Sequence, residues 1–114
     1  MLRIKTELDK LEEYLISRRI TFERIDEDAQ FDEVNRIVIR YARHQICVPC
    51  AQEQGECRWD AICQPGSFGY EKGLLEIYGE IVDPQKDGDT VVGDLTAADV
   101  IQRLEERKRN EDHI

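Results

Sequence analysis

The spacing of the hydrophobic residues changes twice along the chain, and this limits the fold more than any other feature. Near the start, hydrophobic residues recur at intervals of four, three and four, which is one face of an α-helix: Ile4, Leu8, Leu11 and Leu15. Thr6 followed by Asp9 indicates a capping box, so this helix is expected to begin near residue 3 or residue 7. From residue 20 the period falls to two, which is typical of strands, and after Thr96 it returns to that of a helix.

The segment between the two helices predicts several strands, expected at residues 20–25, 34–42, 59–63 and 74–82, with a short edge strand at 91–92. Strands without intervening helices predict an antiparallel sheet in the α+β class. We expect one domain over residues 1–114, with about four strands and both terminal helices packed on one face of the sheet. Residues 44–58 are expected to form a cysteine-containing loop insert, and residues 110–114 a frayed tail.

The charge balance limits the classes of partner. The chain has 25 acidic and 16 basic residues, a formal net charge of −9. Contacts with DNA, RNA or an anionic membrane need a cationic surface, so direct binding to any of these is not expected. No apolar run reaches the roughly 20 residues that span a bilayer, and residues 1–7 lack the apolar core of a signal peptide. We therefore expect a cytoplasmic protein.

The cysteines carry the sharpest chemical pattern. Cys47 and Cys50 form a C-x-x-C pair, and Cys57, Cys63 and His44 lie nearby in the sequence. Cys47, Cys50 and Cys57, together with either His44 or Cys63, would supply the four ligands of one structural zinc ion. The alternatives are reduced thiols with Cys63 buried, a redox pair or a disulfide. A catalytic triad of His44, Asp60 and Cys63 is disfavoured, because an interval of three on one strand places Asp60 and Cys63 on opposite faces.

Two motifs in the second half of the chain carry a resemblance. Residues 59–63 read WDAIC, residues 66–79 read GSFGYEKGLLEIYG, and residues 95–101 read LTAADVI. In these segments the chain resembles a group of small acidic proteins from phages and prophages of Gram-positive bacteria. The resemblance implies a phage-derived protein, and the group offers no catalytic residue to carry over. The C-x-x-C insert is not part of the group's pattern, and Gln64 stands where the group often has histidine.

The glycine-rich loop and the acidic residues point to a binding role. Gly66, Gly69 and Gly73 lack the Gly-Lys-Ser/Thr ending of a phosphate-binding loop, so a loop that packs or presents its aromatic residues is favoured. Exposed aromatic residues beside acids are typical of interfaces with basic partners. The residues expected to bind a partner are Phe68, Tyr70, Glu71, Glu76, Glu80 and Asp83.

These observations predict a non-enzymatic phage or prophage accessory protein. We expect it to bind a host or phage protein that has a basic surface, and to inhibit a nucleic-acid-handling or defence system such as CRISPR. The alternative is a structural zinc-binding interaction module in phage morphogenesis or regulation. A thiol-dependent enzyme is the least favoured interpretation, and the sequence does not predict an oligomeric state.

Overall fold

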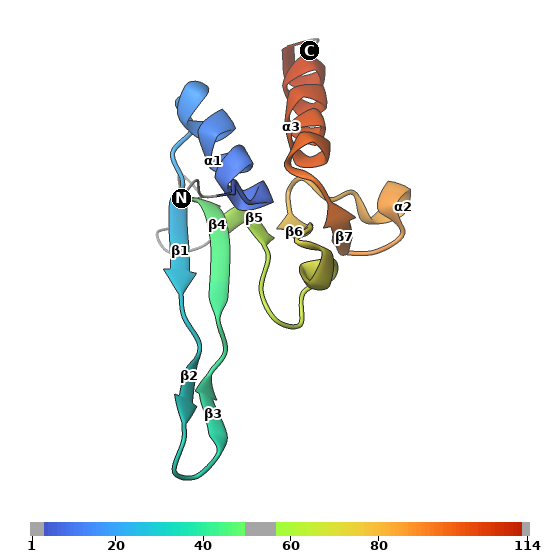
Figure 1. The fold of residues 1–114 in the computed structure, drawn as a ribbon. Helices are drawn as coiled ribbons and strands as arrows, with labels where there is room; N and C mark the ends of the chain where they lie inside the picture. The colour runs from blue at the N-terminus through green and yellow to red at the C-terminus, as the bar shows by residue number, and fades with distance from the viewer. Residues whose placement is uncertain (1–3, 50–56, 113–114) are drawn as a thin grey trace.

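The computed structural model describes residues 4–49 and 57–112. Within them, two long helices flank a series of strands (Figure 1). The elements are α1 (Glu7–Ser17), β1 (Glu23–Glu27), β2 (Gln30–Asp32), β3 (Ile37–Arg40), β4 (Arg43–Pro49), β5 (Cys57–Ile62), η1 (Tyr70–Lys72), β6 (Leu75–Gly79), α2 (Pro84–Asp87), β7 (Val91–Leu95) and α3 (Ala97–Asp112).

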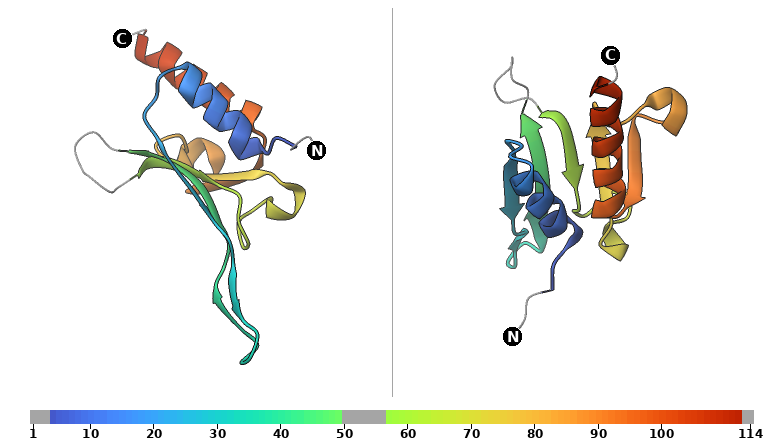
Figure 2. Two further views of the ribbon diagram at one scale, coloured as in Figure 1. Left: turned by 60° about the vertical axis from the view of Figure 1, so that its left-hand side comes forward. Right: turned by 90° about the horizontal axis from the view of Figure 1, so that it is seen from above.

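The main sheet has five strands in the order β1-β4-β5-β6-β7, and every neighbouring pair is antiparallel. Helices α1 and α3 lie side by side on one face of this sheet (Figure 2). The α+β prediction is therefore confirmed, with five strands in the main sheet where about four were expected. No helix in the described part of the chain is long and apolar enough to cross a membrane.

Local sequence explains where both long helices begin. The Thr6 hydroxyl accepts a hydrogen bond from the Asp9 backbone N–H (3.1 Å), and the Asp9 carboxylate accepts one from the Thr6 N–H (2.9 Å). Thr96 and Asp99 form the same reciprocal pair before α3, at 3.0 and 3.1 Å. Each box satisfies two backbone N–H groups that an uncapped helix would leave without partners. Helix α3 continues to Asp112, three residues into the segment expected to fray.

The core lies between the helices and the sheet. One face of each long helix is buried, including Leu8, Leu11 and Leu15 of α1 and Val100 of α3. Alternate residues of the central strands meet them from the sheet: Ile46, Val48, Trp59, Ala61, Leu75 and Ile77. Because side chains alternate along a strand, the residues between these positions face away from the helices.

The prediction of a loop at residues 44–58 is wrong at both ends, because β4 extends to Pro49 and β5 begins at Cys57. Strand β4 occupies Arg43–Pro49 and lies inside the main sheet between β1 and β5. Ile46 is fully buried and Val48 is nearly so, which matches a strand with one face in the core. The signal was the short alternation of Ile46 and Val48 with Gln45 and Cys47. Pro49 obscured it, although a proline is compatible with the last position of a strand.

The strand expected at residues 34–42 forms only in part and outside the main sheet. Residues 33–36 form a turn, and β3 pairs with β2 in a separate two-stranded sheet. This hairpin, which we call the arm (residues 28–42), projects from the body of the protein (Figure 1). It contributes to the elongated shape, whose principal extents are 60 × 36 × 29 Å. Every residue of β3 is exposed.

Candidate protein-binding face

The face of the main sheet that carries no helix is the candidate site, and we call it the open face. Its residues are the alternate positions of β1, β4, β5 and β6, which the strand register arranges in three rows. The first row is Ile25, Gln45, Ile62 and Glu76; the second is Glu23, Cys47, Asp60 and Tyr78; the third and shortest is Glu27 and Arg43. The open face therefore combines carboxylates, aliphatic side chains, one arginine and an exposed tyrosine.

Asp60 lies near the middle of the open face and is half-buried. Its carboxylate accepts a hydrogen bond from Gln45 Nε2 (2.7 Å), and the side-chain oxygen Oε1 of Gln45 accepts two from the Arg43 guanidinium (2.7 and 3.2 Å). Burial raises the pKa of the Asp60 carboxyl, and the negative charge of Glu76 raises it further, against the Gln45 hydrogen bond. A cationic side chain placed here by a partner would therefore stabilise the ionised carboxylate.

Phe68 reaches the open face from the loop before η1. Its backbone N–H donates to the Glu76 carboxylate (3.0 Å), and its carbonyl oxygen accepts from the Asp94 N–H (3.3 Å). Gly93 lies against Phe68, where an added Cβ would come within 3.0 Å of the Phe68 carbonyl oxygen. The ring stays 63% exposed, so the loop fixes the backbone of Phe68 and leaves its side chain presented to solvent.

The other residues expected to bind a partner are divided between two places. Tyr70 and Glu71 belong to η1 and are exposed. Glu80 instead accepts hydrogen bonds from Arg58 (Nε, 3.0 Å) and Arg107 (3.4 Å), and the Arg58 hydrogen bond lowers the pKa of its carboxyl.

Asp83 caps α2 by accepting from the Gln85 N–H (3.1 Å). The structure therefore gives Glu80 and Asp83 structural contacts, and it brings Phe68 and Glu76 together on the open face.

Asp60 and Tyr78 were not predicted from the sequence as residues that bind a partner. Their signal was the alternation of polar and apolar residues in segments 59–63 and 74–78, which places them opposite the core residues.

The predicted zinc ligands are only partly described. Cys47 and Cys57 are joined by a disulfide, with a Cα–Cα separation of 5.4 Å that adjacent strands readily allow. Cys50 lies outside the described residues. His44 Nδ1 is 2.8 Å from Asp26 Oδ1, and no group of described residues forms a metal-binding cluster. The zinc ion stays a prediction, and in the structure two of its five candidate ligands are bonded to each other.

Cys63 is a partly buried free thiol that packs against the core, and burial raises its pKa. Asp60 faces the other way, so the two residues lie on opposite sides of the sheet, as their interval of three predicts. His44 is paired with Asp26 on the helix-covered side. The triad that sequence reasoning disfavoured is therefore not assembled by the fold.

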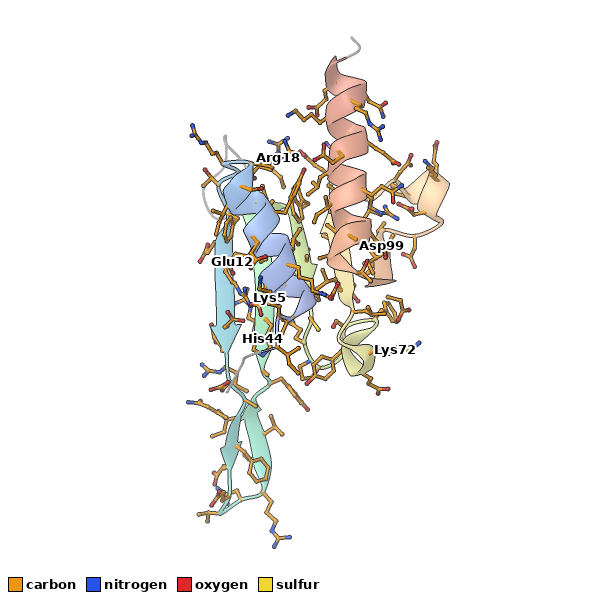
Figure 3. All side chains as sticks on the ribbon, turned by 45° about the horizontal axis from the view of Figure 1, so that its top comes forward. Lys5, Glu12, Arg18, His44, Lys72 and Asp99 are labelled. Carbon is orange, nitrogen blue, oxygen red and sulfur yellow. A yellow bond between two sulfur atoms is a disulfide. The ribbon has the colours of Figure 1, made fainter. Side chains whose placement is uncertain are left out.

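A cluster of charged groups joins α1 to the edge of the sheet on the helix-covered side. The Arg24 guanidinium of β1 is 2.9 Å from Asp9 and 2.9 Å from Asp26, and it also pairs with Glu12. Glu12 on α1 and His44 on β4 are labelled in Figure 3. Burial raises the pKa of the Asp9 carboxyl, but hydrogen bonds from Thr6 and Arg24 outweigh it and lower the pKa overall. The pKa of Asp26 is lowered in the same way by His44 and Arg24.

Replacing Arg24 with methionine is expected to lower the free energy of unfolding at neutral pH by about 2 kcal/mol, because three carboxylates lose a shared cation. The folded-state pKa values of Asp9 and Asp26 lie below their usual values, so this stability is present at neutral pH and is lost as the pH falls through the lowered values. Urea unfolding from pH 7 down to pH 3 measures the difference, which should shrink with acidification. Arg109→Met, at an exposed position of α3, is the control, and an equal loss in both variants would contradict the expectation.

Comparisons of the chain with family models, with curated proteins and with solved structures gave no match. The candidate site is therefore defined by the geometry of this structure alone. It is a small α+β protein whose sheet is covered by helices on one face and presents acids and aromatic rings on the other.

Proposed function

We propose that this is a binding protein that acts without catalysis and docks its open face on the basic surface of another protein. The observation that carries the proposal is the composition of that face. Exposed Tyr78 and Phe68 lie beside Glu76 and Asp60, in a chain of net charge −9. Aromatic rings supply contact area at little entropic cost, and carboxylates select a cationic partner.

The partner we propose is a host or phage protein whose basic surface itself binds nucleic acid. Such surfaces are rich in arginine and lysine, so an anionic face is complementary to them and competes with the phosphate backbone. Asp60 supports this choice, because burial and the charge of Glu76 disfavour its ionised form in the unbound chain. An arginine or lysine from the partner would relieve that cost on binding. Inhibition of a nucleic-acid-handling or defence system is the biological role that follows.

Affinity capture from a Gram-positive host lysate, followed by titration of the purified partner, tests the proposal. We expect Tyr78→Ala to weaken binding about 10-fold or more, as removal of an interface aromatic residue does. Asp60→Asn should weaken it too, and the affinity of the unaltered protein should fall as the salt concentration rises. Glu111→Gln, which removes one negative charge from an exposed position of α3, is the matched control for Asp60→Asn.

The circular dichroism spectrum and unfolding midpoint of each variant are compared with those of the unaltered chain. A variant that binds weakly but keeps both has lost contacts of the open face and has not lost its fold. A partner that binds Tyr78→Ala and Asp60→Asn with unchanged affinity would show that the open face is not the docking site. Affinity that is insensitive to salt would contradict the electrostatic part of the proposal.

A further inference from the structure

A cavity opens on the helix-covered side of the sheet, where α3 extends past the end of α1. The two helices start side by side, because the Ala97 N–H donates a hydrogen bond to the Glu7 carboxylate (2.8 Å). Farther along, the Tyr14 hydroxyl donates one to the Glu105 carboxylate (2.6 Å), and Arg18, after the end of α1, pairs with the same carboxylate (3.1 Å). Helix α1 has 11 residues and α3 has 16, so α3 extends about 7 Å farther (Figure 2). The part of the sheet beneath this extension therefore lacks the cover of α1.

Much of the lining of this cavity, which we call the helix-end cavity, is apolar. Its volume is about 400 Å³, within the range of roughly 300–1,000 Å³ that is typical of ligand pockets. Of its lining residues, Trp59 is buried, and Ile20 and Leu104 are half-buried and pack against the core. The complete apolar lining is Tyr14, Ile20, Val48, Trp59, Ile81 and Leu104. An apolar group placed here would therefore remove the exposed parts of these side chains from water.

The charged residues of the helix-end cavity are mainly basic. Four cations and two carboxylates line it: Arg18, Arg58, Arg107, Lys108, Glu80 and Glu111. This excess of positive charge is opposite in sign to the net charge of −9 of the whole chain. The helix dipole favours basic residues near a helix C-terminus, but Arg58 belongs to β5, so the dipole does not account for the whole group.

A β-bulge explains how Arg58 reaches this cavity. The register of β4 and β5 shifts between Val48 and Pro49 and passes over Arg58. Such a bulge changes the direction of a side chain relative to the alternation of a regular strand. Arg58 therefore lines the cavity together with its neighbour Trp59, although adjacent residues of a regular strand face opposite sides.

The ion pairs of the cavity leave positive charge available to a ligand. Arg58 and Arg107 share one carboxylate, that of Glu80, with N–O distances of 2.9 and 3.4 Å. Lys108 is exposed and forms no ion pair within the described part of the chain. An anion in the cavity would therefore gain charge-assisted hydrogen bonds without first displacing a carboxylate from Lys108.

We propose that the helix-end cavity binds a small amphipathic carboxylate, a molecule in which a short alkyl or aryl group carries one carboxylate. The apolar group packs on Trp59, Ile20 and Leu104, and the carboxylate pairs with the basic residues of the lining. An uncharged apolar molecule would leave these cations without the anion, and an inorganic anion would leave the apolar lining in water. The cavity lies on the opposite side of the sheet from the open face, so this site is separate from the proposed protein-binding surface.

Quenching of tryptophan fluorescence tests the proposal, because Trp59 is the single tryptophan of the chain and lines the cavity. Bromine quenches tryptophan only at short range, so the probes are 8-bromooctanoate and the uncharged 8-bromo-1-octanol. We expect saturable quenching by 8-bromooctanoate with a dissociation constant below about 1 mM, which is within reach of a ligand of this size. The alcohol should bind about 10-fold more weakly or worse, because it lacks the charge that the basic residues recognise.

Substitutions in the lining locate the bound probe. Lys108→Gln should weaken the binding of 8-bromooctanoate about 3- to 5-fold, as the loss of a partly exposed ion pair does. Lys72→Gln is the matched control, because Lys72 is exposed on η1 and does not line the cavity. Leu104→Gln should weaken binding about 5-fold by removing apolar contact. Its control is Ile16→Gln, at an exposed position of α1 outside the lining.

Circular dichroism of each variant confirms that weaker quenching is not caused by unfolding. The absence of saturable quenching at millimolar 8-bromooctanoate would overturn the proposal. Equal affinities for the acid and the alcohol would overturn the choice of an anion, and affinity that survives both Lys108→Gln and Leu104→Gln would show that the probe binds elsewhere. None of these outcomes depends on whether the open face binds a partner.

Discussion

Replacing Gly79 with alanine is expected to lower the free energy of unfolding by about 3–5 kcal/mol, because strain and overlap act together. Gly79 ends β6 with φ of 105°, a conformation that side chains rarely adopt. An added Cβ would lie 2.7 Å from the Trp59 Cα and would also overlap the Arg58 carbonyl oxygen. Both atoms belong to the backbone of β5, and that oxygen also accepts the Glu80 N–H (2.9 Å). Relief of this overlap would therefore require β5 and β6 to separate.

Gly73→Ala separates the two causes. Gly73 also has a positive φ of 71°, but no described atom lies within 4 Å of an added Cβ. Its replacement should cost only the conformational strain, about 1 kcal/mol. Urea unfolding followed by circular dichroism measures both variants. Similar losses at the two positions would mean that contact between β5 and β6 at Gly79 is looser than the structure shows.

Local signals in the sequence predicted the helices well and the strand pairing less well. The capping pairs Thr6–Asp9 and Thr96–Asp99 act within four residues, so they were visible without tertiary information. Strand β4 was missed because its pattern is short and ends in Pro49. The alternation of Ile37, Ile39 and Tyr41 predicted a strand over residues 34–42, of which only Ile37–Arg40 forms β3. Alternation does not say what covers a strand, however, and these side chains proved exposed.

The candidate site depends on register, which no single segment contains. Asp60, Gln45 and Tyr78 come from three strands, and only their pairing places them together. The Cys47–Cys57 disulfide has the same origin, since it needs β4 and β5 to be neighbours. Phe68 and Glu76 were found from sequence because they lie in one segment of aromatic, acidic and glycine residues. Sequence thus located part of the face, and the sheet topology completed it.

Replacing Leu11 with alanine is expected to cause the second large loss in the free energy of unfolding. Leu11 lies in the middle of α1 and is fully buried in the core between that helix and the sheet. Removal of the outer part of its side chain loses the transfer free energy and leaves a cavity that the neighbouring elements can fill only in part. Such replacements cost about 2.7–5 kcal/mol. We expect a loss in this range, with an unfolding midpoint reduced in urea and an unchanged slope.

Ile16→Ala on the same helix is the control that makes the measurement specific to burial. Ile16 is 59% exposed, so its truncation removes little buried surface, and alanine has a higher helix propensity than isoleucine. Its free energy of unfolding should change by less than about 0.5 kcal/mol. If Leu11→Ala were as mild as Ile16→Ala, α1 would not be packed on the sheet. The helix-free face would then no longer be the distinct surface on which the proposed binding depends.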